Sequence, residues 1–284
     1  MKKRRMVAEE RNEKEIVLQV DGRSNYKYPV SAKDAPSYMQ YIGVSNYYRS
    51  GGDHIDCLKT LFCLHTETFN VWSVIISFSF SLFSSSITSC LIHGSWPAFL
   101  LFFFASLVHS PASFCLHLFM PISVETFRYW RKLDMLGIFA GSVCFTFALS
   151  YFVYPWWGIF LNTITTFILA VIASRKFINI PDDVPLNDSS LTIFTFSVII
   201  AYWIPMAFIL CSEGLPFSLA GICAILELLF LCLAALSFTS NWPQKIYPGK
   251  FDIIGNSHHI MRLCVMMAHA DKFCFIYDMA RRKV

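Results

Sequence analysis

Charged residues are scarce in this chain: Asp, Glu, Lys and Arg make up 15% of its 284 residues, whereas 55% are hydrophobic. A soluble domain needs more polar surface than this to cover its core, so the composition excludes an ordinary soluble globule. The 28 phenylalanines and a mean hydropathy of +0.51 indicate the same. We therefore predict an integral membrane protein.

Several sequence features that are absent exclude further classes of protein. The formal charge is +4, but no basic run is interleaved with aromatic residues, so we expect no nucleic-acid partner. The ten cysteines include no CxxC pair and fall mostly in apolar runs, which favours packing between helices over a disulfide framework or a thiolate metal site. No apolar stretch follows the basic residues 2–5, so we expect no cleaved signal peptide.

The rest of the sequence divides into a polar N-terminal arm at 1–60, expected in the cytosol, and an apolar part at 61–284. A mixed-charge run at 9–15 predicts that the arm is solvated and partly disordered. The apolar part contains runs long enough to cross about 30 Å of hydrocarbon. They lie at 70–92, 97–119, 133–153, 156–174, 191–211, 216–238 and 253–278. The sequence thus predicts an all-α integral membrane protein, a bundle of seven transmembrane helices.

Basic residues favour one side of the predicted membrane. With the N-terminus in the cytosol, most loop arginines and lysines are cytosolic, and the opposite loops carry little beyond His93 and Glu213. The cluster at 281–283 opposes this bias and leaves an even number of spans open. We expect a multi-pass protein of the plasma membrane or an internal membrane. The basic residues expected in the cytosol are Arg128, Arg131, Lys132, Arg175, Lys176, Lys245 and Lys250.

Polar residues border or enter the apolar runs on the predicted cytosolic side. Ser113 and His117 lie one helical turn apart, Asp134 opens the third run, His258 opens the seventh, and Glu67 precedes the first. Imidazoles suit zinc, whose catalytic sites typically have three protein ligands and a bound water. His117 and His258 are therefore candidate ligands. Asp134 is a candidate general base, and Ser113 is a candidate hydrogen-bonding or oxyanion partner.

Each of these residues also has a purely structural interpretation. Ser113 suits hydrogen bonding between helices, and Asp134 suits a helix N-terminus, where the helix dipole favours a carboxylate. His117 and His258 are equally suited to packing as neutral side chains. His269 shares the helical face of His258 but lies about 16 Å along the axis, too far to bind the same ion. The case for a site depends on these residues gathering near one leaflet.

Three separated motifs give the chain a family resemblance. They are HTETFNVW at 65–72, Ser113-xxx-His117 with Asp134 and Gly137 downstream, and YPGKFD at 247–252 followed by Ser257-His258. With these motifs the chain resembles the progestin and adipoQ receptor family, also called the adiponectin receptor and hemolysin III family, over about residues 40–270. The first and last motifs are most similar to the adiponectin receptor branch.

The resemblance implies a seven-helix bundle with a cytosolic N-terminus and a zinc ion near the cytosolic leaflet. The ion would be held by one histidine of the second helix and two of the seventh, and His117 and His258 match two of these positions. Ser113 and Asp134 match the serine and aspartate that lie beside the metal in the family.

One position departs from the family pattern. The third metal ligand is replaced by Arg262, and arginine does not ligate zinc because it stays cationic. His259 is a possible substitute ligand, but it is rotated about 100° from His258 on the helix. We therefore expect the fold to be retained and the zinc site to be weakened or lost. Arg262 would then form an ion pair with Asp134 in place of the metal.

The resemblance implies a membrane signalling receptor linked to lipid metabolism, which responds to a lipid, a steroid or a protein hormone. A second hypothesis is a zinc-dependent intramembrane hydrolase of lipid amides, similar to alkaline ceramidases. A third is a non-catalytic membrane scaffold or regulator that binds membrane or cytosolic proteins through its N-terminal arm.

Overall fold

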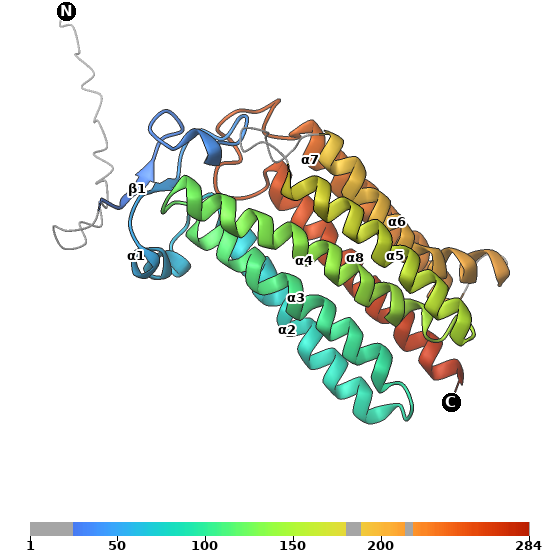
Figure 1. The fold of residues 1–284 in the computed structure, drawn as a ribbon. Helices are drawn as coiled ribbons and strands as arrows, with labels where there is room; N and C mark the ends of the chain where they lie inside the picture. Colours follow the sequence, from blue (N-terminus) through green and yellow to red (C-terminus); the bar gives the residue numbers. More distant parts are fainter. Residues whose placement is uncertain (1–24, 180–188, 214–217, 284) are drawn as a thin grey trace, which may run out of the picture.

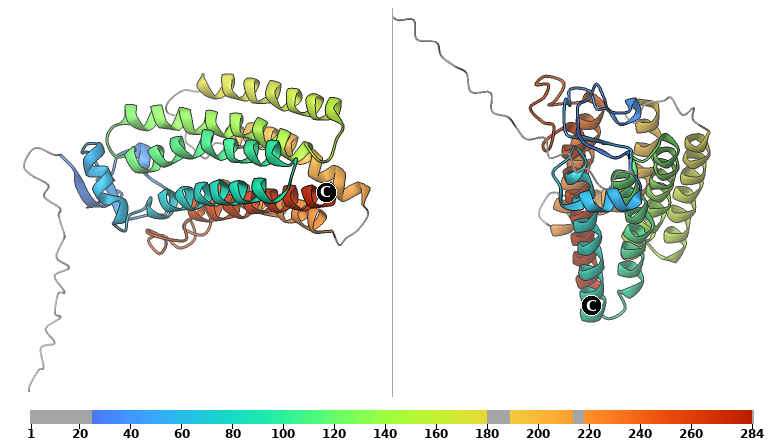
Figure 2. Two further views of the ribbon diagram at one scale, coloured as in Figure 1. Left: turned by 90° about the horizontal axis from the view of Figure 1, so that it is seen from below. Right: turned by 90° about the vertical axis from the view of Figure 1, so that its left-hand side faces the viewer.

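Seven long helices, lying side by side, dominate the computed structural model, which describes residues 25–179, 189–213 and 218–283 (Figures 1 and 2). Each helix packs against the next in the chain, and the last returns to the first, which closes the bundle. The helices are α2 (Thr68–Leu91), α3 (Trp96–Phe119), α4 (Val124–Ser150), α5 (Trp156–Ile178), α6 (Ser189–Ser212), α7 (Leu219–Ser240) and α8 (Ser257–Lys283).

The prediction of a helical, multi-pass membrane protein is confirmed. Within the described residues, α2, α3, α4, α5 and α7 are long and apolar enough to cross a membrane. In α6 a shorter apolar stretch, Ser197–Ser212, is found, and α8 carries charged residues along its length. The total of seven spans and the cytosolic N-terminus stay predictions.

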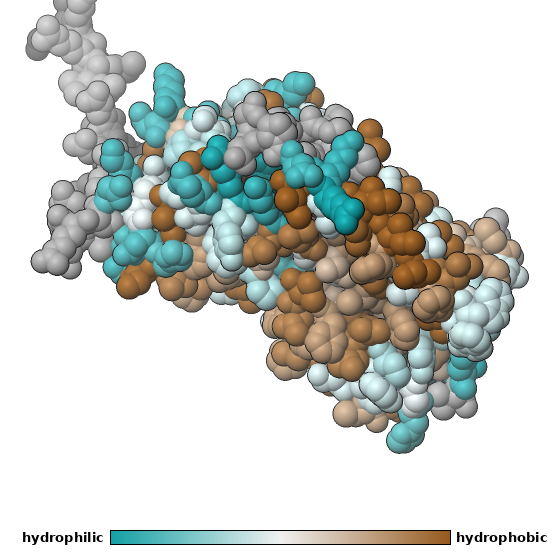
Figure 3. All heavy atoms as spheres, viewed as in Figure 1, coloured by the Kyte–Doolittle hydropathy of each residue, from teal (hydrophilic) through white to brown (hydrophobic). Residues whose placement is uncertain are grey.

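Apolar side chains cover the outside of the bundle. Hydrophobic residues gather over the helices in Figure 3, whereas hydrophilic residues gather at the end of the bundle where the N-terminal segment, residues 25–62, lies. Large apolar side chains such as Phe83, Phe160 and Leu236 are each more than half exposed. An apolar exterior of this extent is stable in lipid and not in water.

Two helices begin at positions other than those the apolar runs predict. α4 begins at Val124, not near 133, because the Ser123 hydroxyl accepts a hydrogen bond from the Thr126 backbone N–H at 3.1 Å and so caps the helix. α8 begins at Ser257, not near 253, because the Asn256 side chain accepts from the His259 backbone N–H at 3.1 Å. Polar caps, which hydropathy does not detect, set both starts.

Residues 25–62 form a folded segment that packs on one end of the bundle, which we call the proximal end. Strand β1 (Lys27–Val30) pairs antiparallel with β2 (Tyr48–Ser50), and helix α1 (His54–Lys59) follows, with short 3-10 turns η1 (Ser37–Met39) and η2 (Thr60–Phe62). The sequence predicts a solvated arm here, but aromatic and aliphatic residues bury together in a small core of their own. The mixed-charge run at 9–15 and the basic residues 2–5 lie outside the described residues.

Helices α3 and α4 lie in close backbone contact where α4 carries glycine. A Cβ atom added at Gly137 would lie 2.9 Å from the Cα of His109 and 3.1 Å from the carbonyl oxygen of Val108. One turn further, a Cβ at Gly141 would lie 3.0 Å from the carbonyl oxygen of Ala105. Small residues at such positions let two backbones pack together in a membrane.

We predict that Gly137→Ala destabilises the bundle by about 1–3 kcal/mol, the usual range for overpacking, because the added methyl collides with the α3 backbone. The thermal unfolding midpoint of the purified protein in detergent measures the effect. Ala140→Val, at an exposed position of the same helix, is the matched control and should leave the midpoint unchanged. An equal midpoint for Gly137→Ala and the native chain would contradict the close approach of α3 and α4.

Candidate functional site

Three helix ends meet at the proximal end, and each contributes one polar side chain to a chain of hydrogen bonds. Glu67 precedes α2, His117 lies in the last turn of α3, and Arg262 lies in the second turn of α8. The Nδ1 atom of His117 lies 2.7 Å from Oε2 of Glu67. The Nε2 atom of His117 is hydrogen-bonded to Nη2 of Arg262. The imidazole therefore connects a carboxylate with a guanidinium.

The partners of His117 determine its tautomer. An ionised carboxylate only accepts hydrogen bonds, and a guanidinium only donates them. The proton of the neutral ring therefore lies on Nδ1, which donates to Glu67, and the lone pair of Nε2 accepts from Arg262. The lone pair of Nε2 is the one that the ring would otherwise offer to a metal.

The carboxylate of Glu67 is fully buried and well supplied with donors. Besides His117, the Asn70 side-chain amide donates to Oε2 of Glu67 at 2.7 Å. Burial on its own would raise the pKa of Glu67, but the hydrogen bonds and charge of its neighbours outweigh burial and hold the pKa below its usual value. Glu67 is therefore ionised, and its charge is balanced by Arg262 across the imidazole.

Of the two other predicted site residues, Ser113 contacts Arg262 and Asp134 does not. The Ser113 hydroxyl lies one turn from His117 and accepts from Nη2 of Arg262 at 2.7 Å, so the structure brings it into the site. Asp134 does not form the predicted ion pair with Arg262 in the described residues. Its Oδ1 lies 2.9 Å from Nε2 of His109 instead, because the close approach of α3 and α4 places these two side chains opposite each other.

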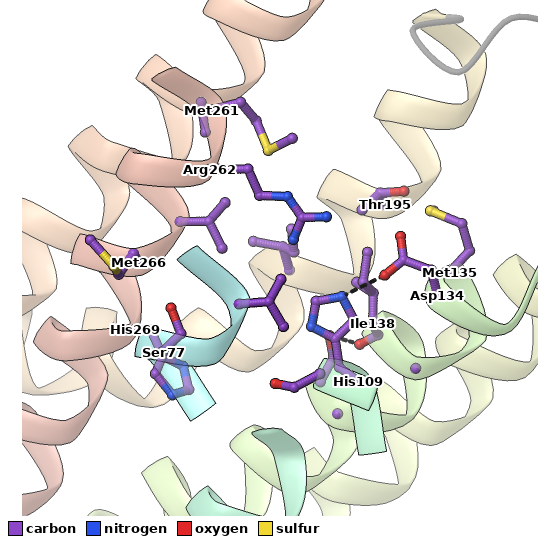
Figure 4. A pocket seen from close by; sticks show the side chains of 18 of the residues that line it. Ser77, His109, Asp134, Met135, Ile138, Thr195, Met261, Arg262, Met266 and His269 are labelled. Carbon is purple, nitrogen blue, oxygen red and sulfur yellow. Dashed lines mark hydrogen bonds and ion pairs between the residues drawn. The ribbon is translucent and has the colours of Figure 1, made fainter. Parts of the chain in front are cut away.

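Figure 4 shows His109 on α3 pointing at Asp134 on α4, with Arg262 reaching toward both from α8. His109 is absent from the residues predicted from the sequence. A signal was available, because His109, Ser113 and His117 are spaced by four residues and so lie along one face of a helix. His109 lies within the apolar run at 97–119, and hydropathy alone gives no reason to single it out.

The two consecutive histidines of α8 face different neighbours. His258 is buried, and its ring meets the ring of His117 edge-on with centroids 5.2 Å apart. Among the described residues neither ring nitrogen of His258 has a hydrogen-bond partner. His259 is turned to the start of α2, where its Nε2 lies 2.9 Å from the carbonyl oxygen of Thr66. His259 therefore does not take the place of the missing third ligand.

The N-terminal segment holds the site from outside the bundle. Arg49 is completely buried and donates to the carbonyl oxygen of His117 at 2.8 Å and to the Thr60 hydroxyl at 2.9 Å. Tyr41 lies against His258, with ring centroids 5.7 Å apart. Neither residue is identifiable from the sequence, because both lie in the segment predicted to be a solvated arm.

These contacts do not fit a zinc ion held by His117, His258 and a third ligand on α8. The third position carries Arg262, and the Nε2 lone pair of His117 is engaged by that same side chain. No group of three or more His, Cys, Asp or Glu side chains is arranged to hold a metal within the part of the chain that the structure describes. What the site can do chemically is accept and donate hydrogen bonds around a fixed cation.

A cavity of about 300 Å³ extends from this site along α8 into the bundle. Its wall is mostly apolar, and all seven long helices contribute to it. Arg262, His258 and Asp134 line it near the proximal end, and His269 and Lys272 line it further along α8. A few polar groups converging on an apolar cavity are typical of a small-molecule site.

Comparison with known protein families matches residues 62–273 to the haemolysin-III related family. The chain belongs to this family. The match covers six of the seven long helices completely and most of α8, and it includes Glu67, His117 and Arg262. The predicted resemblance is thereby confirmed, and membership in the family supports a membrane protein of the receptor type.

Curated relatives carry receptor names. The ADIPOR-like receptor IZH1 of Eremothecium gossypii is 25% identical over 250 residues, which are 79% of this chain and 75% of that protein. The adiponectin receptor protein of Drosophila melanogaster is 30% identical over 80% of this chain and 54% of its own length. Progestin and adipoQ receptor family member 3 of Mus musculus is 28% identical over 85% of this chain and 80% of its own.

We predict that Glu67→Ala and His117→Ala are energetically coupled by about 1–3 kcal/mol, because each removes a partner from the same buried hydrogen bond. A double-mutant cycle of unfolding free energies in detergent measures this coupling. The control pairs Glu67→Ala with Thr146→Val, which removes a buried hydroxyl in α4, away from the site. The two changes in unfolding free energy should add to within about 0.5 kcal/mol. Additive behaviour of Glu67→Ala with His117→Ala would contradict the contact.

Proposed function

We propose that this protein is a lipid-responsive membrane signalling receptor that works without zinc, with Arg262 in the place of the metal. The observation that carries the proposal is the pair of contacts from one nitrogen of Arg262 to the Ser113 hydroxyl and to Nε2 of His117. In the resemblance described above, these are residues that surround the zinc ion. A guanidinium supplies positive charge and fixed N–H donors at that point.

The replacement is balanced in charge. The carboxylate of Glu67, linked through His117, offsets the charge of Arg262; Glu67 is buried and Arg262 is half-buried. A buried cation without such a partner would cost several kcal/mol in a membrane. Arg262 therefore holds α3 and α8 together, as a shared metal ligand set would, without requiring an ion.

A receptor role is supported by the cavity and by the relatives. The names of the matched proteins from fly, mouse and fungus all describe receptors. The apolar cavity beside Arg262 suits a lipid more than a polar metabolite, because most of its wall is hydrocarbon. The link to lipid metabolism, and a lipid, steroid or protein hormone as the stimulus, belong to this proposal.

Hydrolysis of a lipid amide is the second candidate, and one observation favours it. The imidazole of His109 is paired with Asp134 and faces the same cavity, an arrangement that can orient an imidazole as a general base. Neither Ser113 nor His117 contributes to this pair, because Arg262 engages both. Release of fatty acid from a ceramide by the purified protein, abolished by His109→Ala, would support this candidate over the receptor.

We predict that the native protein, purified without a histidine tag or added metal, carries far less than one zinc per chain. Arg262→His should raise the content toward about one, because it restores an imidazole at the third position and releases Nε2 of His117. Arg262→Gln, which removes the charge without supplying a zinc ligand, is the matched control and should stay near the native content. Elemental analysis of the three proteins gives the result.

Two outcomes would contradict the proposal. The first is about one zinc per native chain that is lost in His117→Ala, which would mean that the arginine moves aside for the metal. The second is an Arg262→His protein that folds normally and still binds no zinc, which would mean that Arg262 does not occupy the position of a metal ligand.

A further inference from the structure

The loop that joins α7 to α8, residues 241–256, exposes large apolar side chains at the proximal end of the bundle (Figure 1). Trp242 and Tyr247 are each 50% exposed, Ile246 is 61% exposed and Ile254 is 66% exposed. We call these four side chains the apolar loop residues. Exposed apolar side chains gathered in one segment mark a surface that a membrane or another molecule covers.

The polar side chains of the same loop point inward. Gln244 is fully buried and forms two hydrogen bonds with Ser257 at the start of α8, both 2.7 Å long. The buried carboxylate of Asp252 accepts from the Ser45 backbone N–H at 2.9 Å and from the Asn46 side-chain amide at 3.4 Å. The loop is therefore bonded to α8 and to the N-terminal segment through its polar groups, and its apolar groups stay outside, where contact with water is unfavourable.

The apolar loop residues continue the apolar outer surface of α7. Leu229, Leu233 and Leu236 are exposed in the second half of this helix and share one face of it. α7 is apolar and long enough to cross a membrane, and Trp242 follows its last residue by only two positions. The loop therefore lies where hydrocarbon gives way to lipid headgroups, the level at which tryptophan and tyrosine are enriched in membrane proteins.

The exposed charges of this loop are positive. Lys245 and Lys250 are exposed, whereas Asp252, the only acidic residue at 241–256, is buried against the N-terminal segment. Nζ of Lys250 lies 5.2 Å from the centroid of the Tyr247 ring, which places one cation beside one aromatic side chain. Aromatic and aliphatic side chains favour entry into the edge of the hydrocarbon, and lysines beside them favour an anionic lipid surface.

We propose that residues 241–256 form a binding site for anionic phospholipids in the leaflet at the proximal end. The apolar loop residues enter the boundary between headgroups and acyl chains, and Lys245 and Lys250 pair with the negatively charged headgroups. The inference goes beyond the proposed function, because no residue of this loop lines the cavity beside Arg262. The continuous apolar surface from α7 into the loop favours a lipid surface over a protein as the occupant.

Lipid titration of the purified full-length protein tests the proposal. Native mass spectrometry in detergent gives the affinity for phosphatidylserine and, separately, for phosphatidylcholine. The native protein should bind phosphatidylserine more tightly. In Lys245→Gln with Lys250→Gln the affinity for phosphatidylserine should fall by about 30-fold, because each lysine near an anionic lipid surface contributes about fivefold. The affinity for phosphatidylcholine should stay at the native value.

Lys27→Gln with Lys33→Gln is the matched control, since it removes the same charge from two exposed positions of the N-terminal segment. This variant should keep the native affinity for phosphatidylserine. An unchanged affinity in the loop variant would contradict the proposal. An equal loss in the loop and control variants would also contradict it, because the cause would then be the net charge of the protein and not the loop.

Tryptophan fluorescence in nanodiscs that contain phosphatidylserine tests the apolar half of the proposal. The difference in emission between the native protein and Trp242→Phe isolates the signal of Trp242. Phospholipids brominated on the acyl chain near the headgroup should quench this signal more strongly than phospholipids brominated at the chain end. A Trp242 signal that is equal in brominated and ordinary lipid would refute the proposal, because it would place the loop outside the bilayer and leave its apolar surface to a protein partner.

Discussion

The hydrogen bond between Arg262 and Nε2 of His117 connects the first, second and last of the long helices at one point. Through His117 it reaches Glu67 at the start of α2, and through the same nitrogen of Arg262 it reaches Ser113 on α3. α8 is the last helix of the chain and packs between α7 and α2, so this contact ties the closing helix to the opening ones. The rest of the proximal end is arranged around it.

Such a centre requires support, because the charged carboxylate of Glu67 is buried and the guanidinium of Arg262 is half-buried. Arg49 fixes the carbonyl oxygen of His117, and Asn70 fixes the carboxylate of Glu67. Residues 25–62 are therefore part of the site, because they pack on this end of the bundle and supply the guanidinium donor of Arg49. The cavity and residues 25–62 therefore lie on either side of one hydrogen-bonded group.

Much of the fold could be predicted from the sequence, and the reasons are physical. Apolar runs set the positions of the long helices to within a few residues wherever hydropathy alone determines a boundary, as for α2, α3 and α5. The errors fall where polar groups determine it, as at the Ser123 and Asn256 caps. The folded segment at 25–62 was missed because its small core is built from isolated aromatic and aliphatic residues in a polar composition.

The candidate site was predicted in part for the same reason. The family resemblance places His117, Ser113 and Arg262 around one metal position, and the structure brings the three side chains into contact, although the contact itself is not among the predictions. The pairing of Asp134 was predicted wrongly, because choosing between Arg262 and His109 depends on how closely α3 approaches α4 at Gly137. The Lys272 and Glu227 pair joins residues 45 positions apart on different helices, a relation that sequence spacing cannot reveal.

An experimental density map of the native protein, with anomalous diffraction recorded at the zinc absorption edge, tests the central claim most directly. We predict continuous density for the Arg262 guanidinium against Ser113 and Nε2 of His117, with no anomalous peak between them. An anomalous peak about 2.0–2.1 Å from Nε2 of His117, with the arginine turned away, would contradict the account, because that is the distance of a zinc–histidine bond.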